Sequence, residues 1–91
     1  MSLPVNENPT EAVELPNGGT VTVRGLTRGE ALAVAKFASD AGALEVRLLE
    51  LGAGVTRAEA EEFYSAAPSA DVDAITTTVA RLSGLDPDQG K

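Results

Sequence analysis

The chain has 91 residues, of which 14 are Asp or Glu and 7 are Lys or Arg, so its formal net charge at pH 7 is −7. Scattered basic residues on an acidic chain argue against binding to nucleic acid or to an anionic membrane, because both depend on clustered Lys and Arg. The sequence contains no Cys and no His, so a disulfide framework is excluded. One small domain must therefore be stabilised by packing alone.

The first segment, residues 1–12, contains prolines and asparagines without hydrophobic periodicity and is predicted to be a flexible leader. It lacks the basic start and apolar core of a signal peptide, and no apolar run is long enough to cross a bilayer. We therefore expect a cytoplasmic protein without a membrane partner. The rest of the chain is interpreted as one folded domain at residues 13–85 and a polar tail at residues 86–91.

The first predicted element of the domain is a β-hairpin. Residues 13–15 alternate in polarity, residues 16–19 read Pro-Asn-Gly-Gly, which is typical of a turn, and residues 20–26 are β-branched and alternating. We expect Leu15, Val21 and Val23 on mixed faces of this hairpin. Because an isolated hairpin is only marginally stable in water, it has to pack against a helix or a partner strand.

One long helix is predicted from residue 28 to residue 51. Thr27 and Glu30 form a capping-box motif at its start, and Gly52 and Gly54 are expected to end it. Gly42 lies inside this range and leaves a break near residues 40–42 as the alternative. We favour one helix because an apolar seam runs through Gly42 in phase. That seam consists of Val34, Phe37, Ala41, Leu44, Leu48 and Leu51.

Two shorter helices follow. A second capping box, Thr56 and Glu59, opens a helix that Pro68 ends. Ser69 is expected to cap the last helix, which ends at Gly84 and has two acidic residues in its first turn, where the helix dipole favours them. Its apolar stripe consists of Val72, Ile75, Val79 and Leu82. The predicted fold class is α+β, mostly α, with an N-terminal β-hairpin followed by one long and two shorter helices.

No constellation of residues in the sequence points to catalysis. Acid–base or nucleophilic chemistry needs a group that titrates near pH 7, and neither His nor Cys is present. Asp71 and Asp73 begin like a calcium loop, but Thr76 stands where such a loop needs glycine and Leu82 where it needs glutamate. We therefore expect a protein that is not an enzyme and that has no catalytic residue, metal site or cofactor.

A second apolar face of the long helix is the candidate partner-binding surface. At 100° per residue, a single helix would place this face opposite the first seam. A helix that is apolar on two sides must be covered twice, so either it is central in its own domain or the second face binds another chain. The residues of this face are Leu32, Ala35, Ser39, Gly42, Val46 and Leu49.

The order of several segments resembles the tail assembly chaperones of long-tailed bacteriophages, particularly those that infect actinobacteria. These segments are residues 21–30, 44–52, 55–63 and 75–85. The most characteristic pieces are Arg-Gly-Leu-Thr-Arg-Gly-Glu at residues 24–30 and Leu-Ser-Gly-Leu at residues 82–85. The resemblance extends over roughly the whole predicted domain.

The resemblance implies a non-enzymatic protein of the host cytoplasm that is absent from the mature virion. Such chaperones bind the tape measure protein, a long helical chain, and keep it soluble while the major tail protein polymerises around it. The tape measure protein is therefore the expected partner, and the major tail protein and a second copy of this chain are further candidates. The family is also known for a longer product that arises by programmed frameshifting.

Two other protein classes are alternatives. A head–tail connector component is also a phage morphogenesis protein, but it would stay in the virion. An acidic helical adaptor or carrier domain would need a serine in an Asp-Ser-Leu setting at the start of a helix, and Ser39, Ser69 and Ser83 do not lie in one. Exposed apolar helix surface and net charge both suit a chaperone, so we expect the Ala35–Leu49 face to contact the client or a sister subunit.

Overall fold

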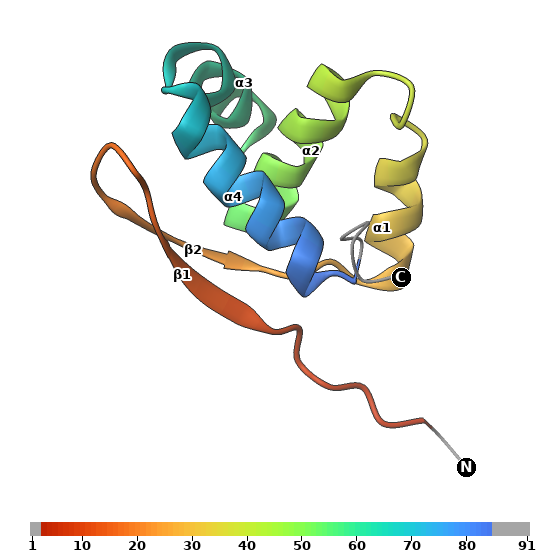
Figure 1. Ribbon diagram of the computed structural model, residues 1–91. Coiled ribbons are helices and arrows are strands. Elements are labelled where there is room, and N and C mark those ends of the chain that lie inside the picture. The colour runs from red at the N-terminus through yellow and green to blue at the C-terminus, as the bar shows by residue number, and fades with distance from the viewer. Residues whose placement is uncertain (1–2, 85–91) are drawn as a thin grey trace, which may run out of the picture.

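The computed structural model describes residues 3–84. Within them it has two strands followed by four helices (Figure 1), so the predicted fold class is confirmed, although the predicted number of helices is too low. The elements are β1 (Thr10–Glu14), β2 (Thr20–Arg24), α1 (Arg28–Ala35), α2 (Ala41–Ala53), α3 (Arg57–Ala66) and α4 (Ser69–Leu82). The predicted polar tail at residues 86–91 lies outside the described residues.

The valines of the hairpin and Leu15 lie on one face, so the expectation of mixed faces is wrong. β1 and β2 are antiparallel, with Val13 opposite Val21 and Glu11 opposite Val23. Residues that lie directly opposite each other share a face, and so does every second residue along a strand. Val13 and Val23 are consequently buried in the core, and Leu15 and Val21 pack against it.

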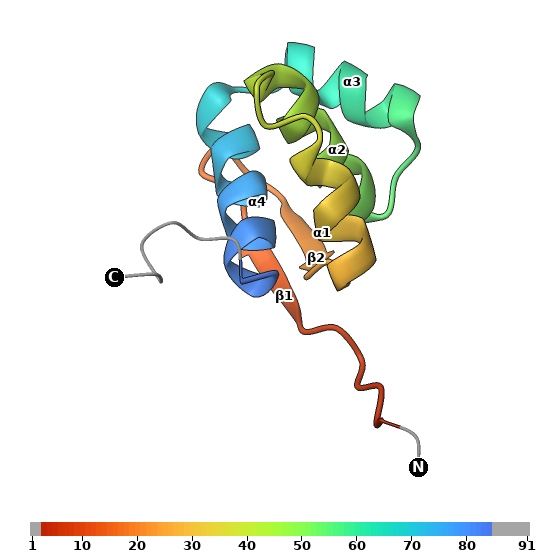
Figure 2. The same cartoon turned by 90° about the vertical axis from the view of Figure 1, so that its right-hand side faces the viewer.

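β1 begins at Thr10, inside the segment that was predicted to be a leader. Residues 3–8 precede it and run away from the body of the molecule in both views (Figures 1 and 2). At the other end of the hairpin, Gly18 and Gly19 have φ angles of 112° and 97°. Only glycine adopts such angles without strain, so this turn forms where the sequence predicted it.

The single long helix predicted from residue 28 to residue 51 is wrong. The chain instead forms α1 and α2, separated by a turn at residues 36–40. Asp40 has an extended backbone (φ −129°, ψ 95°) and its side chain accepts a hydrogen bond from Ala43 N at 3.1 Å, so Asp40 is the N-cap of a new helix. The apolar seam keeps its helical phase across the turn, which is why periodicity alone suggested one rod.

The two glycines that were expected to end the long helix have different roles. Gly54 is the C-cap of α2, with a left-handed φ of 70°. Gly52 lies inside α2 and faces α4, where a Cβ atom at residue 52 would lie 2.9 Å from Cγ1 of Val79 and closer still to its Cγ2. Gly52 therefore allows α2 and α4 to approach closely and does not end the helix.

Both predicted capping boxes are confirmed, whereas the predicted cap of the last helix is wrong. Thr27 Oγ1 accepts a hydrogen bond from Glu30 N at 3.1 Å, and the Glu30 carboxylate accepts one from Thr27 N at 3.0 Å. The box at residues 56–59 makes the same two bonds. Ser69 is the first residue of α4, and Pro68 precedes it as an N-cap without a side-chain hydrogen bond.

The elements form two layers, with the hairpin beneath the helices in Figure 1. The hairpin packs on α4 and α2, α3 packs mainly on α2, and α1 contacts mainly α2. Among residues 3–84, none of the helices has the length and apolar character that a membrane span requires. The core between the layers consists of Val13, Val23, Leu26, Val34, Leu48, Leu49, Ala60, Ile75 and Val79.

Candidate functional site

The six residues of the predicted partner-binding surface do not share one face. The turn at residues 36–40 separates Leu32 and Ala35, on α1, and Ser39, in the turn itself, from the three residues on α2. These first three residues are exposed, and Leu32 retains 59% of its accessible surface. The structure therefore brings together only the second half of the predicted set.

That second half lies against α3 of the same chain. A Cβ atom at Gly42 would be 3.6 Å from the Tyr64 hydroxyl, and Val46 is partly buried against the core. Leu49 is a core residue with 2% of its surface exposed. A continuous, unpartnered Ala35–Leu49 face therefore does not exist, because the chain covers most of the α2 part itself.

The two sequence segments that carry most of the phage resemblance touch each other. Leu26 N donates a hydrogen bond to Ser83 Oγ at 2.8 Å, and this hydroxyl donates to Val79 O at 2.6 Å. A Cβ atom at Gly25 would lie 2.7 Å from the carbonyl oxygen of Leu82, so only glycine fits there. The two segments thus form a junction between the end of β2 and the end of α4.

The first of these segments also contains a bidentate ion pair. Arg24 Nη1 and Nη2 each lie 2.8 Å from one carboxylate oxygen of Glu30. The hydrogen bonds from Arg24, and then the one from the Thr27 backbone, lower the pKa of Glu30 from its usual value of 4.5 to about 2. Both charges are therefore used to hold α1 against the end of β2.

The paired acids of α4 have separate environments and do not form a site. Asp71 is 5% exposed, and its Oδ1 accepts hydrogen bonds from Asn17 N at 3.0 Å and Asn17 Nδ2 at 3.2 Å. Asp73 is exposed. Among residues 3–84, no group of three or more His, Cys, Asp or Glu side chains is placed to hold a metal ion. Asp71 thus fastens the hairpin turn to α4.

A solvent-open apolar hollow lies between α3 and the hairpin, and we call it the α3–hairpin groove. It forms because α3 packs mainly on α2, whereas the hairpin packs on α2 and α4, so α3 and the hairpin face each other without interdigitating. Its volume is about 230 Å³. The residues that line it are Val21, Leu49, Ala53, Val55, Glu59, Ala60, Phe63 and Ile75.

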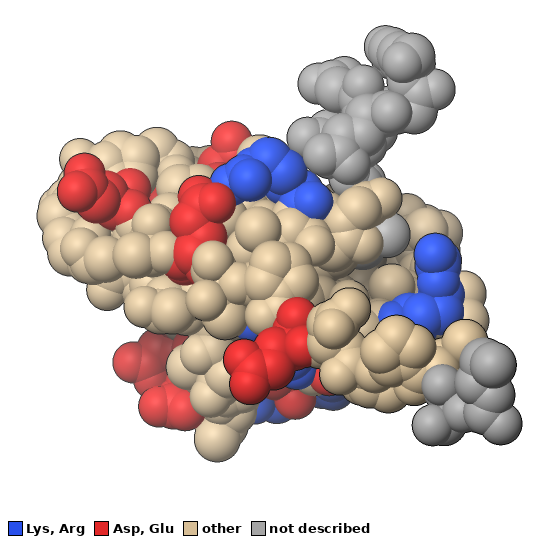
Figure 3. All heavy atoms as spheres, turned by 90° about the horizontal axis from the view of Figure 1, so that it is seen from below, with Lys and Arg blue, Asp and Glu red and all other residues tan. Residues whose placement is uncertain are grey.

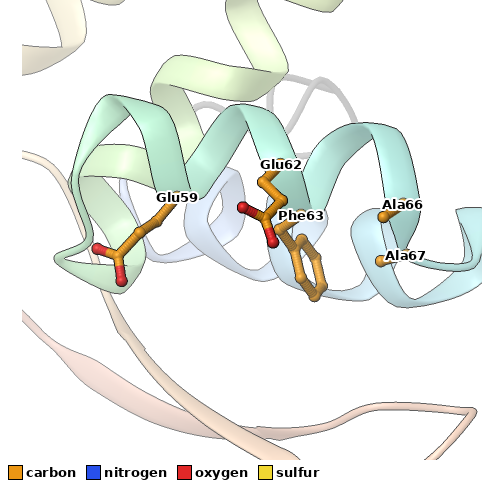
Figure 4. A pocket seen from close by; sticks show the side chains of 5 residues that line it. All are labelled: Glu59, Glu62, Phe63, Ala66 and Ala67. Atoms are coloured by element: carbon orange, nitrogen blue, oxygen red, sulfur yellow. The ribbon is translucent and has the colours of Figure 1, made fainter.

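The α3–hairpin groove continues along α3 toward the end of that helix. Glu59, Phe63 and Ala66 recur at steps of four and three, which places them on one helix face. Figure 4 shows Glu59, Glu62 and Phe63 leaving α3 on the same side, and together with Ala66 and Ala67 they line this second stretch. Phe63 borders both stretches and is only partly buried.

The charge of the α3–hairpin groove is negative, because Glu59 and Glu62 are its charged lining residues and no Lys or Arg of residues 3–84 lines it. Hydrogen bonds from the backbone and then the side chain of Thr56 lower the pKa of Glu59, which keeps it ionised at neutral pH. On the face seen from below, the Lys and Arg side chains of the described residues lie in separate groups among acidic and uncharged ones (Figure 3).

Several basic side chains are engaged elsewhere. Glu50 Oε1 accepts hydrogen bonds from Arg57 Nε at 2.7 Å and from Arg47 Nη1 at 2.8 Å, on the opposite side of α3 from the groove. Arg81 Nη2 lies 2.7 Å from Glu11 Oε1. These pairs stabilise contacts between elements and leave the acidic rim of the α3–hairpin groove without an internal partner cation among residues 3–84.

The α3–hairpin groove was missed from the sequence because it depends on where the hairpin lies relative to α3. The available signal was Phe63, with Glu59 and Glu62 on the same side of a short helix. The groove combines an apolar lining with acidic side chains, so it is suited to a partner that has apolar side chains next to positively charged ones.

No family model, curated protein or solved structure matches this chain.

Proposed function

We propose that this protein is a tail assembly chaperone, which binds the tape measure protein of a long-tailed phage and keeps it soluble during tail tube assembly. The observation that carries the proposal is the α3–hairpin groove, an apolar surface open to solvent on a chain of net charge −7. A chaperone for an amphipathic helical client needs accessible apolar surface to bind it and net charge to keep the complex soluble.

The likeness of residues 24–30 and 82–85 to the chaperone family supports the same function. In this proposal the protein acts in the host cytoplasm without a cofactor, and it leaves the assembly before the virion is complete. The major tail protein and a second copy of the chain are additional partners that the proposal allows. The surface used differs from the one predicted from sequence, since that one is divided between α1, the following turn and α2, and its α2 part is mostly covered by the chain itself.

Co-expression with the tape measure protein of the same genome tests the proposal. We expect the chaperone to raise the soluble fraction of the tape measure protein and to be recovered with it in a pull-down. An unrelated acidic protein of similar size is the control, because it supplies charge without the groove. An insoluble tape measure protein, or a soluble one that leaves the chaperone behind, would contradict the proposal.

Mass spectrometry of purified virions separates the proposal from the connector alternative. A chaperone acts during assembly and is released, so its peptides should be absent from virions while those of the tape measure protein are present. A connector component remains at the head–tail junction and would be detected in every particle. Detection of this chain at a level comparable with structural proteins would therefore reject the chaperone function.

A further inference from the structure

We infer that the α3–hairpin groove binds an α-helical client segment whose apolar anchor side chains are flanked by Lys or Arg. This inference rests on the proposed function and specifies the chemistry of the client. It predicts where on the client this protein binds, because only segments with both features fit. The reasons come from the lining of the groove, from the hydrogen bonding of β2 and from the charges on the rim.

The lining requires apolar anchors. The floor and walls are formed by Val21, Leu49, Val55, Phe63 and Ile75, which come from β2, α2, the α2–α3 connection, α3 and α4. A volume of about 230 Å³ accepts side chains from one face of a helix, while the backbone of that helix stays outside. Burying such side chains yields about 25 cal/mol for each Å² of apolar surface removed from water.

The hydrogen bonding of β2 favours a helix over an added strand. The bonds from Leu15 N to Gly19 O and from Gly25 N to Pro9 O lie at the two ends of the hairpin ladder, and bonded pairs alternate along antiparallel strands. The free N–H and C=O groups of β2 therefore belong to residues 20, 22 and 24. None of these lines the groove, to which β2 contributes only Val21. Strand addition needs those backbone groups, so side-chain docking of a helix is the better fit.

The rim charges select a basic client. Glu59 and Glu62 border the apolar lining on the α3 side, and neither has an Arg or Lys partner among residues 3–84. Lys or Arg beside the anchors would complement these carboxylates and speed encounter with a chain of net charge −7. A second copy of the chain carries the same net charge of −7, which disfavours it as the occupant of this acidic groove and argues for a different protein there.

The test uses two synthetic peptides of about 18 residues, long enough to form a helix when bound. One has a stripe of Leu flanked by Lys, and the other has Glu in place of every Lys. Binding to the full chain is measured by fluorescence anisotropy at low ionic strength. We expect the Lys peptide to bind at least about tenfold more tightly than the Glu peptide. Equal affinities for both peptides would overturn the charge selection.

Matched variants of α3 locate the binding surface. Glu62→Lys reverses a charge on the groove and should weaken binding of the Lys peptide by about fivefold. Glu61→Lys makes the same change one residue earlier, where Glu61 lines a separate hollow with Arg57 and Tyr64, and it should bind nearly as wild type. Ala66→Arg fills the groove at an exposed helix position and should weaken binding by about tenfold. Circular dichroism checks that each variant is folded.

The outcomes keep the inference separate from the proposed function. If the tape measure protein co-purifies with Glu62→Lys and Ala66→Arg as well as with wild type, the groove is not its binding site, although the chaperone function stands. If the tape measure protein fails to bind the wild-type chain, the chaperone function is lost whatever the peptides do. Tighter binding of an alternating, strand-forming Lys peptide than of the helical one would overturn the helical part of the inference.

Discussion

At the scale of single residues, polar groups in this protein are mostly used to join elements. Tyr64 is the only tyrosine of the chain, and its hydroxyl on α3 donates a 2.9 Å hydrogen bond to Glu45 Oε1 on α2. That hydrogen bond, followed by the negative charge of Glu45, raises the pKa of Tyr64. A raised pKa means that the phenol keeps its proton to a higher pH, since ionisation would place two negative charges side by side.

We therefore predict that Tyr64 titrates above the ordinary tyrosine value of about 10. Glu45→Gln removes the charge and should bring the midpoint of the titration back toward that value. The chain has no tryptophan, so ultraviolet absorbance of the tyrosinate reports on this one residue. Glu62→Gln is the control, because Glu62 lies on the groove side of α3 and should leave the midpoint unchanged. A midpoint insensitive to Glu45→Gln would show that the hydrogen bond is absent in solution.

At the scale of elements, the starts of α1 and α3 were predictable from sequence, whereas helix continuity was not. The capping boxes at residues 27–30 and 56–59 are recognisable because each is complete within four residues. The break at Asp40 was harder to recognise because the helical spacing of apolar residues in the sequence continues across it. Asp40, two residues before Gly42, is a typical N-cap residue and was the local signal for the break.

Two glycine substitutions distinguish a glycine needed for packing from one that is merely present in a helix. Gly52→Ala should lower the free energy of unfolding by about 2 kcal/mol, because its methyl group would collide with the fully buried, β-branched Val79. Gly29→Ala places its methyl group no closer than 3.9 Å to Thr27 Oγ1 and should raise that free energy by about 0.5–1 kcal/mol. Urea denaturation of the wild type and the two variants measures both changes in the free energy of unfolding.

The same change of residue type should thus have opposite effects at the two positions. If Gly52→Ala proved neutral or stabilising, α2 and α4 would not approach as closely as the structure shows. If Gly29→Ala were strongly destabilising, the first turn of α1 would be packed against something else. Equal free energies of unfolding for the two variants would contradict at least one of the two assignments.

At the scale of the whole molecule, polar contacts between residues far apart in sequence add to the core packing that holds the hairpin to the helical layer. Asn17 in the turn bonds buried Asp71 on α4, and Glu11 on β1 pairs with Arg81 near the end of the same helix. The side chains of the second pair are 42% and 43% exposed. The position of the hairpin matters for function because it forms one wall of the α3–hairpin groove.

We predict unequal costs for removing these two contacts. Asp71→Ala removes two hydrogen bonds to a buried carboxylate and should lower the free energy of unfolding by about 1–3 kcal/mol. Arg81→Ala removes an exposed ion pair and should lower it by at most about 1 kcal/mol. Urea denaturation at neutral pH measures both. Equal losses for the two variants would mean that Asp71 is as accessible to water as Arg81.

The sequence by itself determined the hairpin, the helices at residues 57–66 and 69–82, the two capping boxes and the acidic surface charge. These features depend on turn glycines, Thr–Glu pairs three residues apart and composition, all of which act locally. Only the tertiary structure decided that the chain turns at Asp40, that Gly52 packs on Val79 and that a groove opens between α3 and the hairpin. The Gly52–Val79 packing and the groove depend on contacts across long sequence separations, which no local pattern specifies. The turn at Asp40 was not recognised because the apolar spacing of the sequence continues across it.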